Sequence, residues 1–225
     1  ALLDEVRFWC ERGVDGFRFD ACNHQFHDAQ LRDNPPARAE AIDEVSTVRA
    51  DNPYAMQQHL HDKSQPENLA FLERLRAVLD EYGAVGLGEV GDENAPPVMA
   101  QYTERGRRLH LAYSFSLLTT EHSAGHLRRQ VQALDAALAR TDGWGCWAVS
   151  NHDVPRVASR WSAGGPLDAR RDKMWLTLLL SLRGSASVYQ GEELGLPEAE
   201  VPFERLQDPY GRAFWPEFKG RDGAR

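Results

Sequence analysis

The strongest constraint in this sequence is a repeated alternation of short apolar runs, typical of strands, with longer amphipathic segments, typical of helices. Strands that alternate with helices pair in parallel, because each helix returns the chain to the same edge of the sheet. The pattern predicts five strands, at residues 14–20, 84–90, 109–115, 146–151 and 185–190.

Helices are predicted between these strands, where apolar residues recur with helical spacing. They cover residues 2–10, which Gly13 ends, residues 67–82, residues 127–138, and residues 169–182 with Asp168 as the cap. Residues 64–67 (SQPE) have the form of a capping box, which predicts that the serine hydroxyl caps the second helix. No cap precedes the first helix, so we expect it to begin upstream of this chain.

Two architectures have parallel strands of this kind: an open, doubly wound sheet and an eight-fold β/α barrel. The doubly wound sheet commonly places a glycine-rich phosphate-binding turn after its first strand. No such turn follows Asp20, where the first predicted strand ends, and this counts against the doubly wound sheet. In both architectures, functional residues lie at the carboxyl ends of the strands.

The charge balance limits the partners of the chain. Lys and Arg number 26 and Asp and Glu number 34, which gives a formal net charge of −8. A nucleic acid or an anionic membrane surface calls for a positive protein surface, so both are disfavoured as partners, whereas a neutral sugar is compatible. The three cysteines show neither a disulfide framework nor a CxxC metal motif.

Charged residues lie at the carboxyl ends of the first two predicted strands. Arg18 and Asp20 share one face of the first strand, because side chains alternate, while Phe17 and Phe19 share the other. A buried pair of this kind would keep Asp20 ionised by lowering its pKa, although a purely structural ion pair would look the same. Glu89 ends the second strand after two glycines that leave room for a close approach, and it could equally be an ordinary loop carboxylate.

The fourth predicted strand ends in the polar run Asn151-His152-Asp153, with Arg156 close behind. Several donors and acceptors at one point suit the vicinal hydroxyls of a sugar, although a turn with Asx bonds is the alternative. Carboxylates therefore end three different strands of one sheet. Two carboxylates suffice to cleave a glycoside, one as nucleophile or base and one as acid.

These motifs together resemble a known family. Residues 16–21 (GFRFDA), 88–90 (GEV) and 151–153 (NHD) are similar to the second, third and fourth signature regions of the α-amylase family, glycoside hydrolase family 13. Residues 31–36, 51–54 and 58–63 resemble bacterial α-glucosidases of its oligo-1,6-glucosidase branch. Residues 220–225 resemble the motif that follows the eighth strand in that branch.

The resemblance implies an α/β fold in which residues 1–225 form part of a (β/α)8 TIM barrel, namely strands four to eight with their helices. The first signature region, the inserted domain and the C-terminal β domain have no counterpart, and the metal site of the family belongs to that missing part. We therefore expect a fragment without metal or cofactor. We also expect the chain to be inactive alone, because five strands leave an open sheet edge.

The resemblance also implies the role of each site residue. The catalytic residues are Asp20 as nucleophile, Glu89 as general acid and base, and Asp153 as the residue that holds ring hydroxyls. The substrate-binding residues are Arg18, which orients the nucleophile, His152 and Arg156 on the attacked sugar, Arg221 (with Arg225 as second choice) at the non-reducing end, and His24 in an outer subsite.

The implied function is a retaining α-glucosidase that releases glucose from the non-reducing end of small α-glucosides, with transglucosylation as a companion activity. The alternatives are a sucrose-acting isomerase or transglucosidase, a non-catalytic glucosidase-like partner domain, and a metal-dependent hydrolase. The last would draw its zinc ligands from His24, His27, Asp28, His59, His61 and Asp62. A cytoplasmic location is expected. The sequence leaves open the linkage preference and the oligomeric state.

Overall fold

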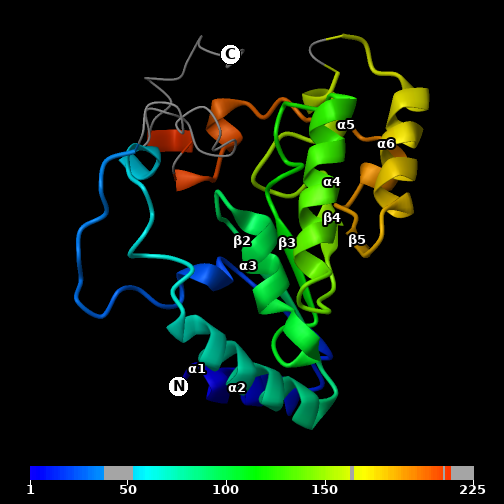
Figure 1. Cartoon of the computed structure of the whole chain (residues 1–225). Coiled ribbons are helices and arrows are strands. Elements are labelled where there is room, and N and C mark those ends of the chain that lie inside the picture. Colours follow the sequence, from blue (N-terminus) through cyan, green and yellow to red (C-terminus); the bar gives the residue numbers. More distant parts are fainter. Residues whose placement is uncertain (38–52, 163–164, 210, 214–225) are drawn as a thin grey trace.

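The computed structural model describes residues 1–37, 53–162, 165–209 and 211–213, in which five strands alternate with helices (Figure 1). The strands are β1 (Gly16–Phe19), β2 (Val85–Val90), β3 (Leu111–Ser114), β4 (Cys146–Ala148) and β5 (Ser185–Ser187). The α-helices are α1 (Leu2–Cys10), α2 (Glu67–Tyr82), α3 (Ala95–Tyr102), α4 (Ala124–Leu138), α5 (Val157–Arg160) and α6 (Ala169–Ser181). Short 3₁₀ helices are η1 (Cys22–His24), η3 (Pro53–Met56), η4 (Glu104–Gly106), η5 (Glu192–Leu194) and η6 (Phe203–Arg205).

The strands lie side by side in chain order and pair in parallel. One sheet has the order β1-β2-β3 and the other joins β4 to β5, and a parallel bridge between Ala112 and Gly145 links the two. A doubly wound sheet reverses its strand order at a switch point, whereas a barrel keeps the strands in sequence. The observed order is therefore that of part of a β/α barrel, as predicted.

The two faces of the strands differ in what covers them. Phe17 and Phe19 of β1 and Trp147 of β4 belong to the large core, which the helices share. On the other face, a small cluster is built around Tyr113 and Cys146. Because helices pack against only one face, the other face is the interior of a barrel rather than a second helix-covered layer.

The predicted helices form, and two more appear. Asp168 caps α6 as expected, since its Oδ1 accepts a hydrogen bond from the backbone N–H of Arg170 at 2.9 Å. Helix α3 was not predicted, because two prolines open it and read as loop, although proline is well tolerated in a first helical turn. The single-turn helix α5 was also missed.

The predicted capping box is wrong. Pro66, not Ser64, is the cap residue of α2, and no side chain caps this helix. The hydroxyl of Ser64 donates instead to Asp92 in the loop after β2, and the amide of Gln65 donates to the backbone oxygens of Leu60 and Lys63 at 2.9 and 2.8 Å. The segment before α2 is thus held by tertiary contacts rather than by a local cap.

Within the part of the chain that the structure describes, none of the helices combines the length and the apolar character that crossing a bilayer requires.

Candidate active site

One arginine joins the first two predicted catalytic residues. Arg18 Nη1 donates to Asp20 Oδ1, and Arg18 Nη2 donates to Glu89 Oε1. The Arg18 side chain is 33% exposed and that of Glu89 is 6% exposed. A guanidinium that serves two carboxylates holds both at a fixed place, because its donors form a rigid planar fork.

Strand register explains why these side chains meet. Phe19, the last residue of β1, pairs with Gly88 of β2. The residues that come next in the chain are Asp20, directly after β1, and Glu89 of β2. Glu89 in turn pairs with Tyr113 of β3. A shift of one residue in this register would turn a carboxylate toward the helices, because side chains alternate between faces.

The Glu89 carboxyl is surrounded by hydrogen-bond donors at the carboxyl end of the barrel strands. Its Oε1 accepts a hydrogen bond from the Tyr113 hydroxyl at 2.6 Å, and its Oε2 accepts one from the backbone N–H of Ala21 at 3.1 Å. Burial, together with the hydrogen bond to Glu89, raises the pKa of Tyr113 to about 12. The phenol therefore stays protonated at neutral pH and acts as a permanent donor to Glu89.

The environment of Asp20 favours its ionised form. The pKa of Asp20 lies below its usual value, first because of a hydrogen bond with the Glu89 carboxyl, and further because of the hydrogen bond and charge of Arg18 and the charge of His152, while burial opposes the shift. The Asp20 side chain is 77% exposed, so a molecule in the site can reach it. An exposed, ionised carboxylate is what a nucleophile at a sugar carbon requires.

A cavity of about 350 Å³ lies beside these groups. It is lined by side chains at the carboxyl ends of four neighbouring strands, β2 to β5, together with Arg18 of β1. The lining residues are Arg18, Leu87, Tyr113, Ser150, Asn151, His152, Ser187, Val188, Tyr189 and Gln190. A hollow of this size at this end of a barrel matches the place and volume of small-molecule sites.

The run after β4 brings Asp153 and His152 to the same end of the strands. Asn151 donates its side-chain amide to Asp153 Oδ2 at 3.1 Å and accepts the Asp153 backbone N–H at 3.0 Å. His152 Nε2 lies 3.3 Å from Asp153 Oδ1. The Asx bonds of a turn are therefore present, and they hold the Asp153 carboxylate in place next to a histidine that lines the cavity.

Arg156 braces the wall of the cavity. Its Nη1 donates to the backbone oxygen of Gln190 at 2.6 Å, and its guanidinium lies 4.8 Å from the centre of the Tyr189 ring. Tyr189 and Gln190 line the cavity, whereas Arg156 is not among its lining residues. A direct contact of Arg156 with substrate stays a prediction, and its observed contacts support the loop after β5.

The remaining predicted site residues lie farther out or outside the described residues. His24 ends η1, with its ring 6.3 Å from that of Tyr54, and desolvation lowers its pKa. Its place beside residues 53–64 fits an outer position, and its role stays a prediction. Arg221 and Arg225 lie outside the residues that the structure describes.

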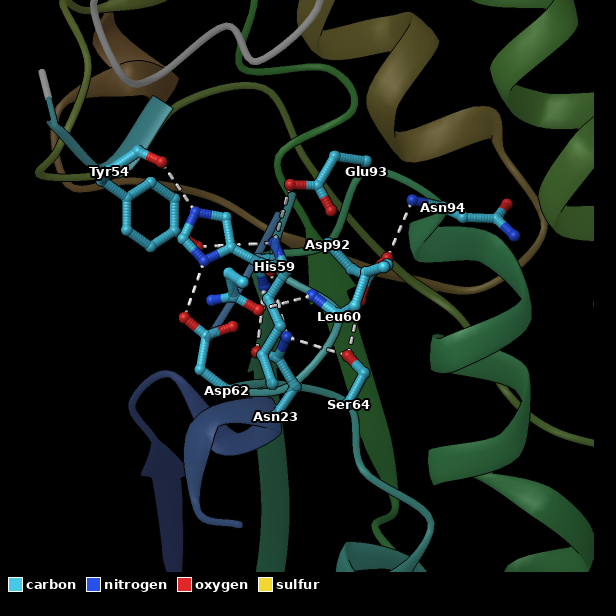
Figure 2. A network of polar contacts seen from close by, with 12 residues as sticks. Asn23, Tyr54, His59, Leu60, Asp62, Ser64, Asp92, Glu93 and Asn94 are labelled. Atoms are coloured by element: carbon cyan, nitrogen blue, oxygen red, sulfur yellow. Dashed lines mark hydrogen bonds and ion pairs between the residues drawn. The ribbon is translucent and has the colours of Figure 1, made fainter. Parts of the chain in front are cut away.

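His59, one of the histidines that could suggest a metal-dependent hydrolase, has both ring nitrogens engaged. Figure 2 shows His59 between its two partners: one ring nitrogen lies 2.8 Å from Asp62 Oδ2 and the other 2.8 Å from the backbone oxygen of Tyr54. Among the described residues, no three His, Cys, Asp or Glu side chains are grouped so as to hold a metal ion. His59 therefore orders the loop rather than presenting a free nitrogen.

The sequence analysis missed Tyr113 as a residue of the site. Its signal was available, because a tyrosine on the inward face of the third predicted strand has a hydroxyl that needs a partner when buried. Asn23 was also missed, since nothing in the sequence shows which backbone atoms its amide meets.

Comparisons with known proteins agree with this arrangement. A family model described as "Alpha amylase, catalytic domain" matches residues 1–225. A probable alpha-glucosidase of Rhizobium meliloti (strain 1021) is 50% identical over 230 residues, which cover 100% of this chain and 41% of that protein. A probable oligo-1,6-glucosidase 2 of Bacillus subtilis (strain 168) is 25% identical over 92% of this chain and 36% of its own length.

A solved structure is similar throughout the chain. The crystal structure of an alpha-glucosyl transfer enzyme, XgtA, has 55% sequence identity and a TM-score of 0.87, and the match covers 98% of this chain and 41% of that one. The chain thus spans about 41% of the length of these relatives.

Proposed function

The chain belongs to the alpha-amylase family, and from this premise we propose that it carries the catalytic carboxylates of a retaining α-glucosidase. Such an enzyme would release α-glucose from the non-reducing end of small α-glucosides. The observation that carries the proposal is the bridge that Arg18 makes between Asp20 and Glu89 beside the cavity. The names of the relatives, a probable alpha-glucosidase and oligo-1,6-glucosidases, support the same substrate class.

In the first step, Asp20 attacks the anomeric carbon of the terminal glucose while protonated Glu89 gives its proton to the glycosidic oxygen. The bond from the anomeric carbon to that oxygen breaks, a bond to Asp20 forms, and the leaving sugar departs as an alcohol. The low pKa of Asp20 supports its role as the ionised partner. A retaining mechanism needs the carboxyl groups about 5–5.5 Å apart, and a shared arginine holds them close.

In the second step, Glu89 is a carboxylate and takes a proton from water. The water oxygen attacks the anomeric carbon, the bond to Asp20 breaks, and two inversions leave the configuration retained. The donors around Glu89, from Tyr113 and the Ala21 N–H, support this step because they hold the Glu89 carboxyl in a fixed place.

Asp153 and His152 would hold the glucose ring. The transition state resembles an oxocarbenium cation, so a nearby carboxylate stabilises it. Asp153 is held by Asn151 and keeps its side chain 45% exposed, which leaves it accessible to ring hydroxyls. Arg221 at the non-reducing end, and the direct contacts of Arg156 and His24, belong to this proposal as well.

Transfer to a sugar instead of water is the second candidate function, favoured by the 55% identity to an alpha-glucosyl transfer enzyme. Both reactions share the first step, and they differ in whether water or a sugar hydroxyl attacks the intermediate. A product profile of the full-length protein on maltose, isomaltose and sucrose distinguishes hydrolysis, transfer and isomerisation, and it also gives the linkage preference.

We also propose a cytoplasmic location, without nucleic-acid or membrane partners. The net charge of −8 disfavours polyanionic partners. Cys10, Cys22 and Cys146 are free thiols, which suits a reducing compartment.

The decisive test is to trap the intermediate. The full-length protein is incubated with a fluorinated α-glucoside, which slows the second step, and the labelled peptide is identified by mass spectrometry. A glucosyl adduct on Asp20 is expected, and Asp20→Asn should give neither adduct nor turnover. An adduct on another residue, or substantial activity in Asp20→Asn, would contradict the assignment.

A further inference from the structure

The bonds between the first two strands continue beyond the ladder. The last backbone pair of β1 and β2 joins Phe19 to Gly88. Beyond it, the backbone N–H of Ala21 donates to Glu89 Oε2 at 3.1 Å, and the Cys22 thiol donates to the Glu89 backbone oxygen at 3.2 Å. The loop that follows Asp20 is therefore fastened to the end of β2 residue by residue.

Asn23 provides the last of these bonds, and its side chain is fully buried. Its Nδ2 donates to the backbone oxygen of Gly91 at 3.0 Å, and its Oδ1 accepts the Gly91 backbone N–H at 3.3 Å. The amide thus pairs with Gly91 as a neighbouring strand would. Asn23 stands three residues after Asp20, and Gly91 stands two residues after Glu89. The bonds between Asn23 and Gly91 therefore join the two loops just beyond the two carboxylates.

The same amide reaches a third segment. Asn23 Nδ2 also donates to Ser64 Oγ at 3.1 Å, and the Ser64 backbone N–H donates to the Asn23 backbone oxygen at 2.7 Å. Figure 2 shows Ser64 between Asn23 and Asp92, to which its hydroxyl donates. A single buried side chain therefore ties the loops after β1 and β2 to the segment before α2.

Local strain accompanies this junction. Ala21 has φ 40° and Ser64 has φ 54°, both in the left-handed region that non-glycine residues rarely adopt. Each of the two uses its backbone N–H in the network, Ala21 toward Glu89 and Ser64 toward Asn23. Strained residues persist only where surrounding contacts hold them, and they cluster at functional sites.

We propose that Asn23 is a positioning residue that fixes the separation of the Asp20 and Glu89 carboxyls by locking the two loops that carry them. The inference rests on the proposed function, because it gives those carboxyls their roles as nucleophile and proton donor. Asn23 itself touches neither substrate nor the reacting atoms. Its side chain acts through Gly91 and Ser64.

The leaving group of the substrate gives a specific readout. Without Asn23, Glu89 would lie less well aligned with the glycosidic oxygen when Asp20 attacks, so a substrate that needs protonation would suffer most. A disaccharide needs its leaving oxygen protonated, whereas the fluoride ion of α-glucosyl fluoride leaves with little help from an acid. Simple loss of folded enzyme would slow both substrates equally.

The experiment compares kcat/KM of the full-length protein and of Asn23→Ala on maltose and on α-glucosyl fluoride. We expect Asn23→Ala to lose about 30-fold on maltose and no more than about threefold on the fluoride. Equal losses on both substrates, or no loss on maltose, would overturn the proposal. A wild-type protein that cleaves neither substrate would instead refute the proposed function, so the two failures are distinguishable.

Asn68→Ala is the matched control. Asn68 is another fully buried asparagine, whose amide donates to the Cys22 backbone oxygen and to the Tyr102 hydroxyl, each at 2.8 Å, without touching Gly91. It should lower the melting temperature while changing both substrates by the same factor. If Asn23→Ala fails to fold, Ser64→Ala removes one partner of the amide and should shift the substrate ratio the same way by about threefold; an unchanged ratio would overturn the proposal.

Discussion

The hydroxyl of Tyr113 lies 2.6 Å from Oε1 of Glu89, inside the barrel end, and the two residues are register partners on neighbouring strands. The same hydroxyl also accepts a hydrogen bond from Arg18 Nη2 at 3.2 Å. Arg18, Tyr113 and Glu89 therefore form a closed set of contacts, in which a cation, a phenol and a carboxyl group are hydrogen-bonded to one another. This set satisfies the polar atoms of a side chain that is only 6% exposed, and buried polar groups are costly unless they are hydrogen-bonded.

Tyr113→Phe should slow the reaction without unfolding the protein. The substitution removes only the hydroxyl that donates to Glu89, and a hydrogen bond to a charged group is worth about tenfold in rate when it acts in the transition state. Steady-state kinetics on an aryl α-glucoside give the change. Tyr82→Phe is the matched control, because the Tyr82 hydroxyl donates to Glu11 on the surface, at 3.5 Å. Equal rates in the two variants would contradict a role for Tyr113.

Arg18→Lys should cost more, at least about 100-fold in kcat/KM, even though it preserves the charge. An ammonium cannot span Asp20 and Glu89 with the planar fork that Arg18 uses. Arg170→Lys serves as the control, since the Arg170 side chain is 92% exposed and pairs with Asp168, the cap residue of its own helix. Near-normal activity in Arg18→Lys would show that charge alone suffices at this position.

Much of the fold was predictable from local patterns. All five strands were found at their predicted places, because short strand-like runs alternate with longer segments of helical periodicity. Strand ends were predicted longer than observed, since the polar residues after β1 and β4 leave the ladder to build the site. Helix α3 was missed because its opening prolines suggest a loop when they are read without their context.

The meeting of Arg18, Asp20 and Glu89 was also predictable from local patterns, because alternation along the first two strands separates them from the helix-facing residues. The contacts of Ser64 and Asn23 were not predictable. Both are made with segments distant in the sequence, and a serine before a helix reads locally as a cap. The role of such a polar residue depends on its partners in the tertiary structure, and a local sequence pattern does not identify those partners.

His110 should make the stability of the protein depend on pH. Its Nδ1 accepts the Gly86 backbone N–H at 3.1 Å, and its pKa lies below the usual value, first because of desolvation and then because of the charge of Arg76. The unfolded chain therefore binds the proton more readily, so the contribution is complete above about pH 6.5 and declines as the pH falls further. Thermal melts at neutral and mildly acid pH should show a smaller loss for His110→Asn, which cannot be protonated, than for the wild type. An equal loss in both proteins would exclude His110 as the source.

Gly88→Ala should damage the packing behind the site. A Cβ at Gly88 would meet Leu109 Cδ1 at 2.5 Å and Cys22 Sγ at 2.7 Å, both of which lie in the large core. The two glycines around Leu87 thus leave room for core side chains rather than for substrate. We expect a loss of about 1–3 kcal/mol in the free energy of unfolding, because overpacking a tight core forces neighbours to move. Displacing Cys22, which bonds the Glu89 backbone oxygen, should lower activity as well.

Gly125→Ala tests whether that effect comes from the site of the substitution rather than from the loss of glycine. Gly125 lies in the first turn of α4, and a Cβ there would make only ordinary contacts, the nearest at 3.5 Å from Arg129. Alanine is the better helix former, so this variant should melt at the same temperature as the wild type or higher. Chemical denaturation of both variants gives the comparison. If Gly88→Ala were as stable as Gly125→Ala, the core behind β2 would have to be looser than the close approach of Leu109 and Cys22 implies.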